Sequence, residues 1–331
     1  MQKLSVAFLG IGHDHALFIL NSLKKQSDLF ELAGYYIPPQ EKALFPDRLP
    51  HLASIPERPL EELLQDPGIH AVVIESEELR LTALAQQAAE HSKHIHMDKP
   101  GSPDAAAFHH LVETARQRNL TFHLGYMYRY NPAVIALREK VRSGALGEIF
   151  SVEAQMNCRH APQKRQGLSQ FPGGMMFFLG CHLVDLVLQL RGTPQAVHCF
   201  NRSTGADGVD AADYGMAILD YPNGVSFIKT CAEEIGGFAR RQLVVSGTRG
   251  TVELKPFEMY ETLPEHYTGV TEYADAPWND PGISYHTPQF DRYDDMMAAF
   301  RRMALGQIPN PWTYDYELAL FDTILCCCGG N

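Results

Sequence analysis

The first third of the chain alternates short apolar runs with longer segments in which apolar residues recur every three or four positions. The short runs predict buried strands, and the longer recurrence predicts helices that face a core. Predicted strands cover 3–9, 32–37, 71–74, 94–97 and 121–124, and predicted helices cover 16–25, 60–65, 81–92 and 104–118. A proline-rich loop is expected after the second strand. Because strands alternate with helices, we predict an α/β domain over residues 1–124, built on a parallel sheet with helices on both faces.

After about residue 125 the pattern changes to longer alternations of β-branched and polar residues. Such alternation predicts strands with one buried and one exposed face. Predicted strands cover 149–157, 195–201, 214–221, 224–231 and 242–245, and predicted helices cover 133–143, 183–191, 291–305 and 316–326. We therefore expect a second, α+β domain over residues 125–331, built on an open, mostly antiparallel sheet.

A glycine turn follows the first predicted strand and reads G-x-G-x-x-H. In the dinucleotide-binding fingerprint of Rossmann domains, the first glycine permits the turn and the second lets backbone N–H groups approach a pyrophosphate. The turn predicts cofactor contacts at Gly10, Ile11, Gly12, His13 and His15. An ordinary strand-to-helix turn is the alternative. We interpret the two histidines as solvent-side or helix-start residues and expect no metal site, because no His and carboxylate set with metal spacing accompanies them.

Composition restricts the class of partner. The 331 residues are 45% hydrophobic, long enough for two cores, and carry a formal net charge of −11. That charge disfavours nucleic acid and anionic membranes as partners and leaves a small molecule as the expected one. The seven cysteines include no C-x-x-C pair, no apolar run reaches membrane-spanning length, and no export signal is recognisable, so we expect a cytoplasmic protein.

Five further motifs stand in order along most of the chain. They are Met97-Asp98-Lys99-Pro100, Arg129-Tyr130-Asn131-Pro132, the segment 143–149 (SGALGEI), Gly173-Gly174 followed by 180–185 (GCHLVD), and 246–251 (SGTRGT). In this order they resemble the E-K-P, R-[FY]-N-P, S-G-x-[IL]-G-E-[IL], G-G … G-x-H-x-x-D and G-T-x-G signatures of the glucose-fructose oxidoreductase / inositol dehydrogenase / MocA (Gfo/Idh/MocA) family. The first of them has Asp98 in place of Glu, which keeps the charge.

The resemblance implies roles for individual residues. Lys99 and His182 would be the catalytic pair, and hydride removal from a carbinol carbon does require a group that accepts the hydroxyl proton. Further cofactor contacts are implied at Ile37, Glu75, Ser76, Asp98 and Lys99. Substrate contacts are implied at Tyr126, Tyr128, Arg129, Asn131, Arg159, His182 and Asp185. Asp185 shares a helix face with His182, so it is expected to orient the imidazole or to contact the substrate, unless it only favours the helix start.

Besides Asp98, three segments depart from the family pattern. Phe178 stands four residues before His182, where the family commonly has an Asp. The loop after the third strand reads Glu75-Ser76-Glu77-Glu78 in place of A-T-P-[NP], and Ile37-Pro38 replaces the residues that contact the adenosine ribose. The expected cofactor is therefore NAD or NADP, with NAD preferred on family grounds.

These observations predict an NAD(P)-dependent dehydrogenase that moves hydride to or from a hydroxyl carbon of a sugar, cyclitol or sugar-acid derivative. The basic segment 158–165 is expected to attract a carboxylated or phosphorylated sugar, with a solvated loop as the alternative. Two other functions stay open: an NAD-retaining lyase or hydrolase that uses transient oxidation, and a catalytically degenerate module that senses a metabolite or dinucleotide. The open sheet predicts a homodimer or homotetramer that pairs through residues 197–200 and 225–228.

Overall fold

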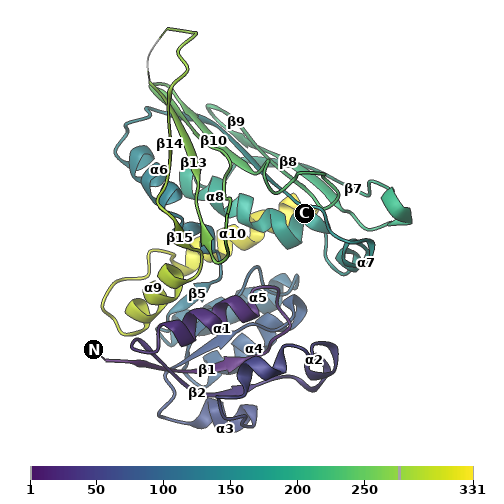
Figure 1. The fold of residues 1–331 in the computed structure, drawn as a ribbon, viewed down its shortest axis with the longest axis vertical. Coiled ribbons are helices and arrows are strands. Elements are labelled where there is room, and N and C mark those ends of the chain that lie inside the picture. Colours follow the sequence, from purple (N-terminus) through teal and green to yellow (C-terminus); the bar gives the residue numbers. More distant parts are fainter. Residues whose placement is uncertain (1, 275–276, 331) are drawn as a thin grey trace. The chain divides into compact units, whose positions relative to one another are not determined.

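A computed structural model describes residues 2–274 and 277–330 (Figure 1). The chain divides into two compact units, each formed from two separate segments. Residues up to Met127 join Tyr293–Leu318 in the first unit, and Tyr128–Arg292 joins Ala319–Asn331 in the second. This division differs from the predicted single boundary after residue 124, because the chain returns to the first unit near its end.

The first unit is a Rossmann domain with a five-stranded parallel sheet in the order β2-β1-β3-β4-β5. The strands are β1 (Leu4–Leu9), β2 (Phe30–Tyr36), β3 (Ala71–Ile74), β4 (His94–Met97) and β5 (Phe122–Leu124). The helices between them are α1 (Ala16–Lys25), α2 (Pro39–Leu44), α3 (Leu60–Gln65), α4 (Glu78–Glu90) and α5 (Ala105–Gln117). The prediction of this domain is confirmed, but the supposed proline-rich loop contains α2, which becomes important at the site.

Helix α9 (Asp294–Ala304) packs on the Rossmann sheet although it lies far from it in sequence. Its apolar face is buried, and the ring of Phe300 stacks on His123 of β5 with ring centroids 5.6 Å apart. At its first residue, Asp294 accepts a hydrogen bond of 2.7 Å from Ser22 of α1. The sequence pattern predicts this helix correctly but does not say which core it covers, because an amphipathic helix fits any complementary apolar surface.

The second unit contains an eight-stranded sheet in the order β14-β13-β11-β10-β6-β9-β8-β7. The strands are β6 (Ile149–Asn157), β7 (Ala196–Arg202), β8 (Tyr214–Tyr221), β9 (Gly224–Cys231), β10 (Gln242–Gly247), β11 (Gly250–Leu254), β13 (Gly269–Ala274) and β14 (Ile283–His286). Only the β6–β9 pairing among these is parallel, so the predicted open and mostly antiparallel sheet is confirmed. A separate two-stranded ribbon joins β12 (Glu265–His266) to β15 (Phe290–Asp291).

Helices supply the core on one face of this sheet. They are α6 (Pro132–Arg142), the short α7 (Pro162–Gly167), α8 (Cys181–Arg191) and the second half of α10 (Tyr314–Cys327). Along β8, alternate residues such as Ala217 and Leu219 are fully buried, as the alternating sequence pattern predicts. The opposite face of β7, β8 and β9 carries Phe200 and Val225, which are 47% and 51% exposed.

Two further observations concern the cysteines and the helices. All seven cysteines are free thiols. None of the helices in the described part of the chain combines the length and apolar character that a membrane span requires.

Candidate functional site

The turn between β1 and α1 is built on two glycines that tolerate no side chain. Gly10 has φ of +83°, in the left-handed region that glycine favours, and a Cβ there would lie 2.6 Å from the Cα of Ser76. A Cβ on Gly12 would lie 2.5 Å from Glu77 Cγ and 2.8 Å from Glu77 N. The turn therefore packs tightly against the loop after β3, with its backbone N–H groups brought together.

These N–H groups hold an oxyanion that belongs to the chain itself. The N–H groups of Ile11 and Gly12 donate to one carboxylate oxygen of Glu41, at 2.7 and 2.8 Å. The other oxygen accepts from the Ser76 hydroxyl and from the Glu77 N–H at 3.2 Å. The Glu41 side chain is fully buried. The turn thus has the donors and the space for an anionic oxygen pair, which is the chemistry that a pyrophosphate requires.

Sequence reasoning did not find Glu41, because it placed this segment in a loop. Pro39 occupies the first turn of α2, where proline is favoured, and this signal could have indicated a helix start. The backbone carbonyl groups of the same turn are bound by a cation. The Arg48 guanidinium donates hydrogen bonds to the carbonyl oxygens of Ile11 at 2.8 Å, His13 at 2.9 Å and Gly12 at 3.2 Å.

The positions after β2 offer no charged group to a ribose. Ile37 is buried, and Pro38 precedes the first turn of α2. Lys42, the nearest cation along the chain, is paired with the Glu57 carboxylate.

The acidic loop after β3 is arranged so that its charges are separated. Glu75 turns inward and is fully buried, with a carboxylate oxygen 3.7 Å from the Nε2 of His96. Glu77 lies 3.6 Å from the Arg80 guanidinium, and Glu78 lies 3.7 Å from the Nε2 of His13. Burial, followed by the nearby charge of Asp98, raises the pKa of Glu75 well above its usual value.

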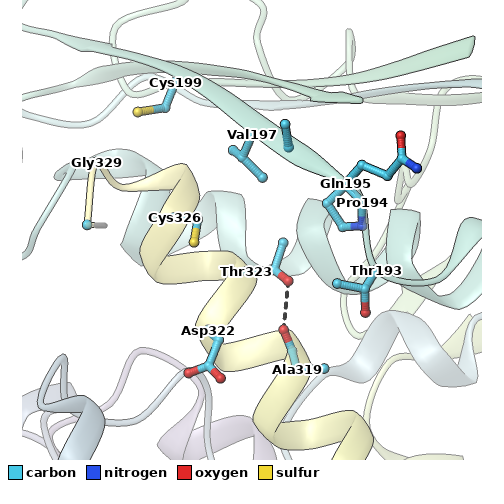
Figure 2. Close-up of a pocket in the computed structure, with 12 residues that line it drawn as sticks. Thr193, Pro194, Gln195, Val197, Cys199, Ala319, Asp322, Thr323, Cys326 and Gly329 are labelled. Atoms are coloured by element: carbon cyan, nitrogen blue, oxygen red, sulfur yellow. Dashed lines mark hydrogen bonds between the residues drawn. The ribbon is translucent and has the colours of Figure 1, made fainter. Parts of the chain in front are cut away.

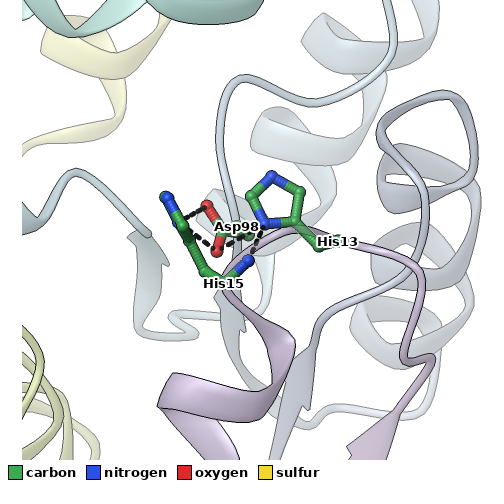
Figure 3. Close-up of side chains that lie close together, drawn as sticks. All are labelled: His13, His15 and Asp98. Atoms are coloured by element: carbon green, nitrogen blue, oxygen red, sulfur yellow. Dashed lines mark hydrogen bonds and ion pairs between the residues drawn. The ribbon is translucent and has the colours of Figure 1, made fainter. Parts of the chain in front are cut away.

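His13, His15 and Asp98 converge at the carboxyl ends of β1 and β4 (Figure 3). The Nδ1 atoms of His13 and His15 each lie 3.0 Å from the same oxygen, Oδ2, of Asp98. Of the two interpretations given for these histidines, the solvent-side one is wrong for His13, which is 1% exposed, and the helix-start one is confirmed for His15, which is the N-cap residue of α1. Burial opposes ionisation of Asp98, but the two imidazoles outweigh it and lower the pKa of Asp98 well below its usual value. The carboxylate that seemed to be missing near the histidines in sequence is supplied by another strand.

Lys99 directly follows Asp98 and is buried in the first unit. Its backbone N–H donates to Oδ1 of Asp98 at 2.7 Å, so the two residues are held as one rigid pair. Tyr126, two residues beyond β5, is buried in the same unit.

His182 lies at the start of α8 in the second unit, directly after one turn of π-helix (Met176–Gly180). Its ring meets the edge of Tyr128 with centroids 4.9 Å apart. Phe178 stacks on Phe171 at 6.1 Å and has the Lys164 ammonium 5.3 Å from its ring centre. π-Helical turns are frequent at functional sites, and this one sets the position of His182 in the helix.

The motif Arg129-Tyr130-Asn131-Pro132 has a structural role in the second unit. Arg129 and Asp185 are both buried and form an ion pair, with Nη2 2.8 Å from Oδ1. The Asp185 carboxylate also accepts a hydrogen bond from Gln189, one turn further along α8, at 2.8 Å. Asn131 caps α6 by accepting from Ala133 N–H at 2.8 Å. These contacts give Arg129, Asn131 and Asp185 a part in the fold of the second unit, and their substrate roles stay predictions.

Tyr128 is likewise engaged inside the second unit. Its hydroxyl donates to Glu258, a buried carboxylate that also pairs with Arg241 and Arg292. Burial alone would raise the pKa of Glu258, but the two guanidinium groups and the Tyr128 hydrogen bond lower it to about 2.

The basic segment 158–165 presents only part of the expected cluster of cations, because one of its four basic side chains is buried. Arg165 is fully buried and pairs with Asp213 at 3.0 Å, with Glu233 at 3.2 Å and with Asp207. Arg159 is exposed and lies 3.4 Å from Glu233. Internal carboxylates therefore neutralise much of the charge that the sequence suggested for substrate attraction.

A cavity of about 600 Å³ lies between β7 and the end of α10 in the second unit (Figure 2). Its lining includes Val197, Cys199, Asp322, Thr323 and Cys326, and the Thr323 hydroxyl donates to the carbonyl of Ala319 at 2.7 Å. None of the predicted site residues lines it, so it has no part in the site described above.

Two protein-family models match consecutive parts of the chain. The model described as "Oxidoreductase family, NAD-binding Rossmann fold" matches residues 4–126, and the "GFO/IDH/MocA C-terminal domain" matches residues 134–253. Together these matches span most of both units.

Individual proteins show the same likeness. An uncharacterized oxidoreductase of Escherichia coli, YhhX, is 27% identical over 327 residues, which cover 93% of this chain and 91% of that protein. The trans-1,2-dihydrobenzene-1,2-diol dehydrogenase of Bos taurus is 30% identical over 59% of this chain and 57% of its own length. The structure of an aldose-aldose oxidoreductase from Caulobacter crescentus, complexed with glycerol, matches with a TM-score of 0.80 at 17% identity, covering 98% of this chain and 96% of its own.

Replacement of Glu258 by Gln tests the buried charge cluster of the second unit. The folded-state pKa of Glu258, about 2, lies below its ordinary value of 4.5, so ionised Glu258 stabilises the fold above about pH 4.5. This stabilisation is lost as the pH falls from about 4.5 towards 2. We expect Glu258→Gln to cost about 3 kcal/mol at pH 7, because it leaves buried guanidinium charge uncompensated. The difference in Tm between the variant and the parent should narrow in acid.

The measurement is thermal unfolding at pH 7 and at pH 3, followed by circular dichroism. Glu261→Gln is the matched control, because Glu261 is exposed in the same unit and should leave Tm unchanged at either pH. A Tm difference for Glu258→Gln that is as large at pH 3 as at pH 7 would contradict the assignment.

Proposed function

The chain belongs to the Gfo/Idh/MocA family of NAD(P)-binding oxidoreductases, and from this we propose that it is a dehydrogenase acting on a hydroxyl carbon of a sugar, cyclitol or sugar-acid derivative. The observation that carries the proposal is the oxyanion cradle of Ile11, Gly12, Ser76 and Glu77 around the Glu41 carboxylate. That cradle lies where the first strand of a Rossmann sheet meets its helix, which is the phosphate-binding position of the fold.

The residues present fit a dinucleotide on one condition. Two backbone N–H groups and a hydroxyl already hold two oxygens of one anion, so they can hold a pyrophosphate oxygen pair in the same way. The Glu41 carboxylate uses these donors, and two anions cannot share them without strong repulsion. Glu41 must therefore release the turn when a dinucleotide binds.

Lys99 and His182 are the residues we propose for the chemistry. The nicotinamide, when bound, exchanges a hydride with the substrate carbon. The chain must then accept or return the hydroxyl proton, and histidine and desolvated lysine are the side chains that do this near neutral pH. Lys99 is buried next to the ionised Asp98, and His182 follows the π-helical turn of the second unit. Phe178 has no titratable group, so the proposed proton transfer rests on these two residues.

We propose NAD rather than NADP as the preferred cofactor. A 2′-phosphate is usually held by a cation near the end of the second strand. In this chain Lys42 is paired with Glu57, Arg58 with Asp66 at 2.8 Å, and Arg48 with backbone carbonyls of the turn. These cations already have partners, which favours the dinucleotide that lacks the extra phosphate.

The proposed substrate class draws on the names of the relatives. One relative is a dehydrogenase of a cyclic diol and another is an oxidoreductase of aldoses. Both substrates carry neighbouring hydroxyl groups on a small carbon framework. A polyhydroxylated ring or its acid derivative therefore remains the class to test first.

A homodimer is proposed from the outer face of the second sheet. Phe200 and Val225 are about half exposed there, and Met216, Ile218 and Phe227 are their half-buried neighbours on the same face. An apolar sheet face of this kind is normally covered.

Light scattering tests this proposal. We expect it to give twice the mass of one chain, or four times that mass for a dimer of dimers. The double variant Phe200→Asp with Val225→Lys should lower the measured mass to that of the monomer. A monomeric parent protein would contradict this proposal.

Titration with NADH and NADPH tests the cofactor assignment directly. We expect nicotinamide fluorescence to report micromolar binding of NADH and weaker binding of NADPH. Gly12→Asp should weaken NADH binding by roughly 100-fold or more, because its carboxylate must enter the cradle or displace Glu77. The matched control is Gly167→Asp, since Gly167 has open space around its Cβ position and should bind NADH normally.

The converse variant is Glu41→Gln. It removes the charge that competes for the cradle, so NADH affinity should rise by about tenfold. Failure of the parent and of Glu41→Gln to bind either dinucleotide would remove the dehydrogenase proposal and favour the sensing module.

Turnover measurements test the proposed pair. With a substrate found in a panel of sugars, cyclitols, sugar acids and cyclic diols, Lys99→Met and His182→Asn should each lower kcat by roughly 10²- to 10⁴-fold. NADH binding by His182→Asn should be unchanged. The exposed residues Lys255 and His70 provide the controls Lys255→Met and His70→Asn, which should keep full activity. Full activity of Lys99→Met or His182→Asn would remove that residue from the proposal.

A further inference from the structure

We propose that His13, His15 and Asp98 form a binding site for a divalent transition-metal ion of the zinc type, with Glu75 as an additional ligand. The three residues each offer one ligand atom, and these atoms all lie within 4.8 Å of one another (Figure 3). The ligand atoms of this site differ from the donors of the oxyanion cradle, although His13 and Glu75 adjoin Gly12 and Ser76 in the chain, and the inference does not depend on hydride transfer.

The spacing of the ligand atoms suits a small cation. Zinc bonds to imidazole nitrogen and carboxylate oxygen are about 2.0–2.2 Å long, so two ligands in a tetrahedral site are roughly 3.3 Å apart. The Nδ1 atoms of His13 and His15 each lie 3.0 Å from Asp98 Oδ2. Small rotations of the two rings would open these separations to the coordination distance without moving the backbone.

Asp98 is oriented by a contact outside the cluster. Its other oxygen, Oδ1, accepts the Lys99 N–H at 2.7 Å and lies 3.3 Å from His15 Nδ1, and Oδ2 is the oxygen nearest to the two imidazoles. Metal-binding carboxylates are typically fixed in this way by a hydrogen bond to the oxygen that does not face the ion.

Glu75 supplies the second, independent observation. Its side chain is fully buried, and neither carboxylate oxygen has a hydrogen-bond partner among residues 2–274 and 277–330. One of these oxygens, Oε2, lies 3.9 Å from the Nδ1 of His13, on the side of the ring that faces Asp98. Glu75 and Asp98 are two buried carboxyl groups close enough for Asp98 to raise the pKa of Glu75, and a cation shared with the histidines would offset both the burial and this repulsion.

The outer side of the site is also typical of a metal centre. The Nε2 atom of His13 has no hydrogen bond within the described chain and lies 3.7 Å from a carboxylate oxygen of Glu78. A carboxylate behind a metal-bound imidazole fixes the tautomer with an unprotonated Nδ1, and the His15 N–H that now donates to His13 Nδ1 at 3.2 Å would be displaced by the ion. Two imidazoles with one or two carboxylates favour Zn²⁺, Co²⁺, Fe²⁺ or Ni²⁺ over Mg²⁺ and Ca²⁺, which prefer oxygen ligands only.

A hydrogen-bonded His-Asp-His cluster without an ion is the competing explanation. The two differ in one measurable respect, because only a metal site binds an added ion with a fixed stoichiometry. We therefore test the full-length protein after treatment with EDTA and removal of the chelator, using the metal ion alone as the probe.

Isothermal titration with Zn²⁺ should give one ion per chain with a micromolar or tighter Kd, and Co²⁺ should give the visible absorption of a low-symmetry nitrogen and oxygen site. Asp98→Asn and His15→Ala should each weaken Zn²⁺ binding by at least about 100-fold. Mg²⁺ should not compete. His109→Ala/His110→Ala, which removes two neighbouring exposed histidines of α5, is the matched control and should bind Zn²⁺ like the parent.

The outcome is read together with circular dichroism of each variant. His15 has a partly exposed side chain, so His15→Ala should fold even if Asp98→Asn does not. Absence of one-to-one Zn²⁺ or Co²⁺ binding, or binding that His15→Ala leaves unchanged, would overturn the proposal. Titration with NADH in the presence of EDTA measures cofactor binding without the metal. Loss of Zn²⁺ binding is therefore distinguishable from loss of NADH binding.

Discussion

The first turn of the Rossmann unit must place an anion against its backbone N–H groups, and the surrounding structure follows from that requirement. Gly10 and Gly12 leave no room for side chains, so the N–H groups of Ile11 and Gly12 point together at one place. Buried donors need acceptors. In this chain the Glu41 carboxylate satisfies them, and the position and burial of α2 are consequences of that contact.

Buried charges elsewhere in the molecule follow the same rule of internal compensation. Arg129 pairs with Asp185, Arg165 with Asp213 and Glu233, and Glu258 with two guanidinium groups. Each such group is held because an unpaired charge in the interior costs far more than the pair. This explains why several residues in family-like motifs serve the fold. A sequence motif identifies the fold to which its residues belong. Only the contacts of each residue in the structure tell whether that residue positions other groups or binds a ligand.

The cluster around Asp98 is a second place where buried polar groups lack complete internal compensation. Glu75 and the Nε2 atom of His13 lack hydrogen-bond partners within the described residues. The cluster also adjoins Lys99 through Asp98, at the carboxyl end of β4, where ligands of parallel sheets bind. These two groups, at this edge of the sheet, are part of the basis of the metal site proposed above.

The sequence by itself determined the order of elements, the Rossmann class of the first unit and the open sheet of the second. It could do so because periodicity and turn chemistry are local properties, and the strands 71–74, 94–97, 149–157, 214–221 and 224–231 have the bounds that the pattern predicts. The tertiary structure alone decided which distant residues meet. Glu41 reaches a turn about 30 residues away, Asp98 meets a histidine 83 residues away, and Arg129 meets an aspartate 56 residues away. Such contacts depend on how strands are ordered in a sheet and on which carboxylate fills a buried donor set, and neither is written in the spacing of residues along the chain.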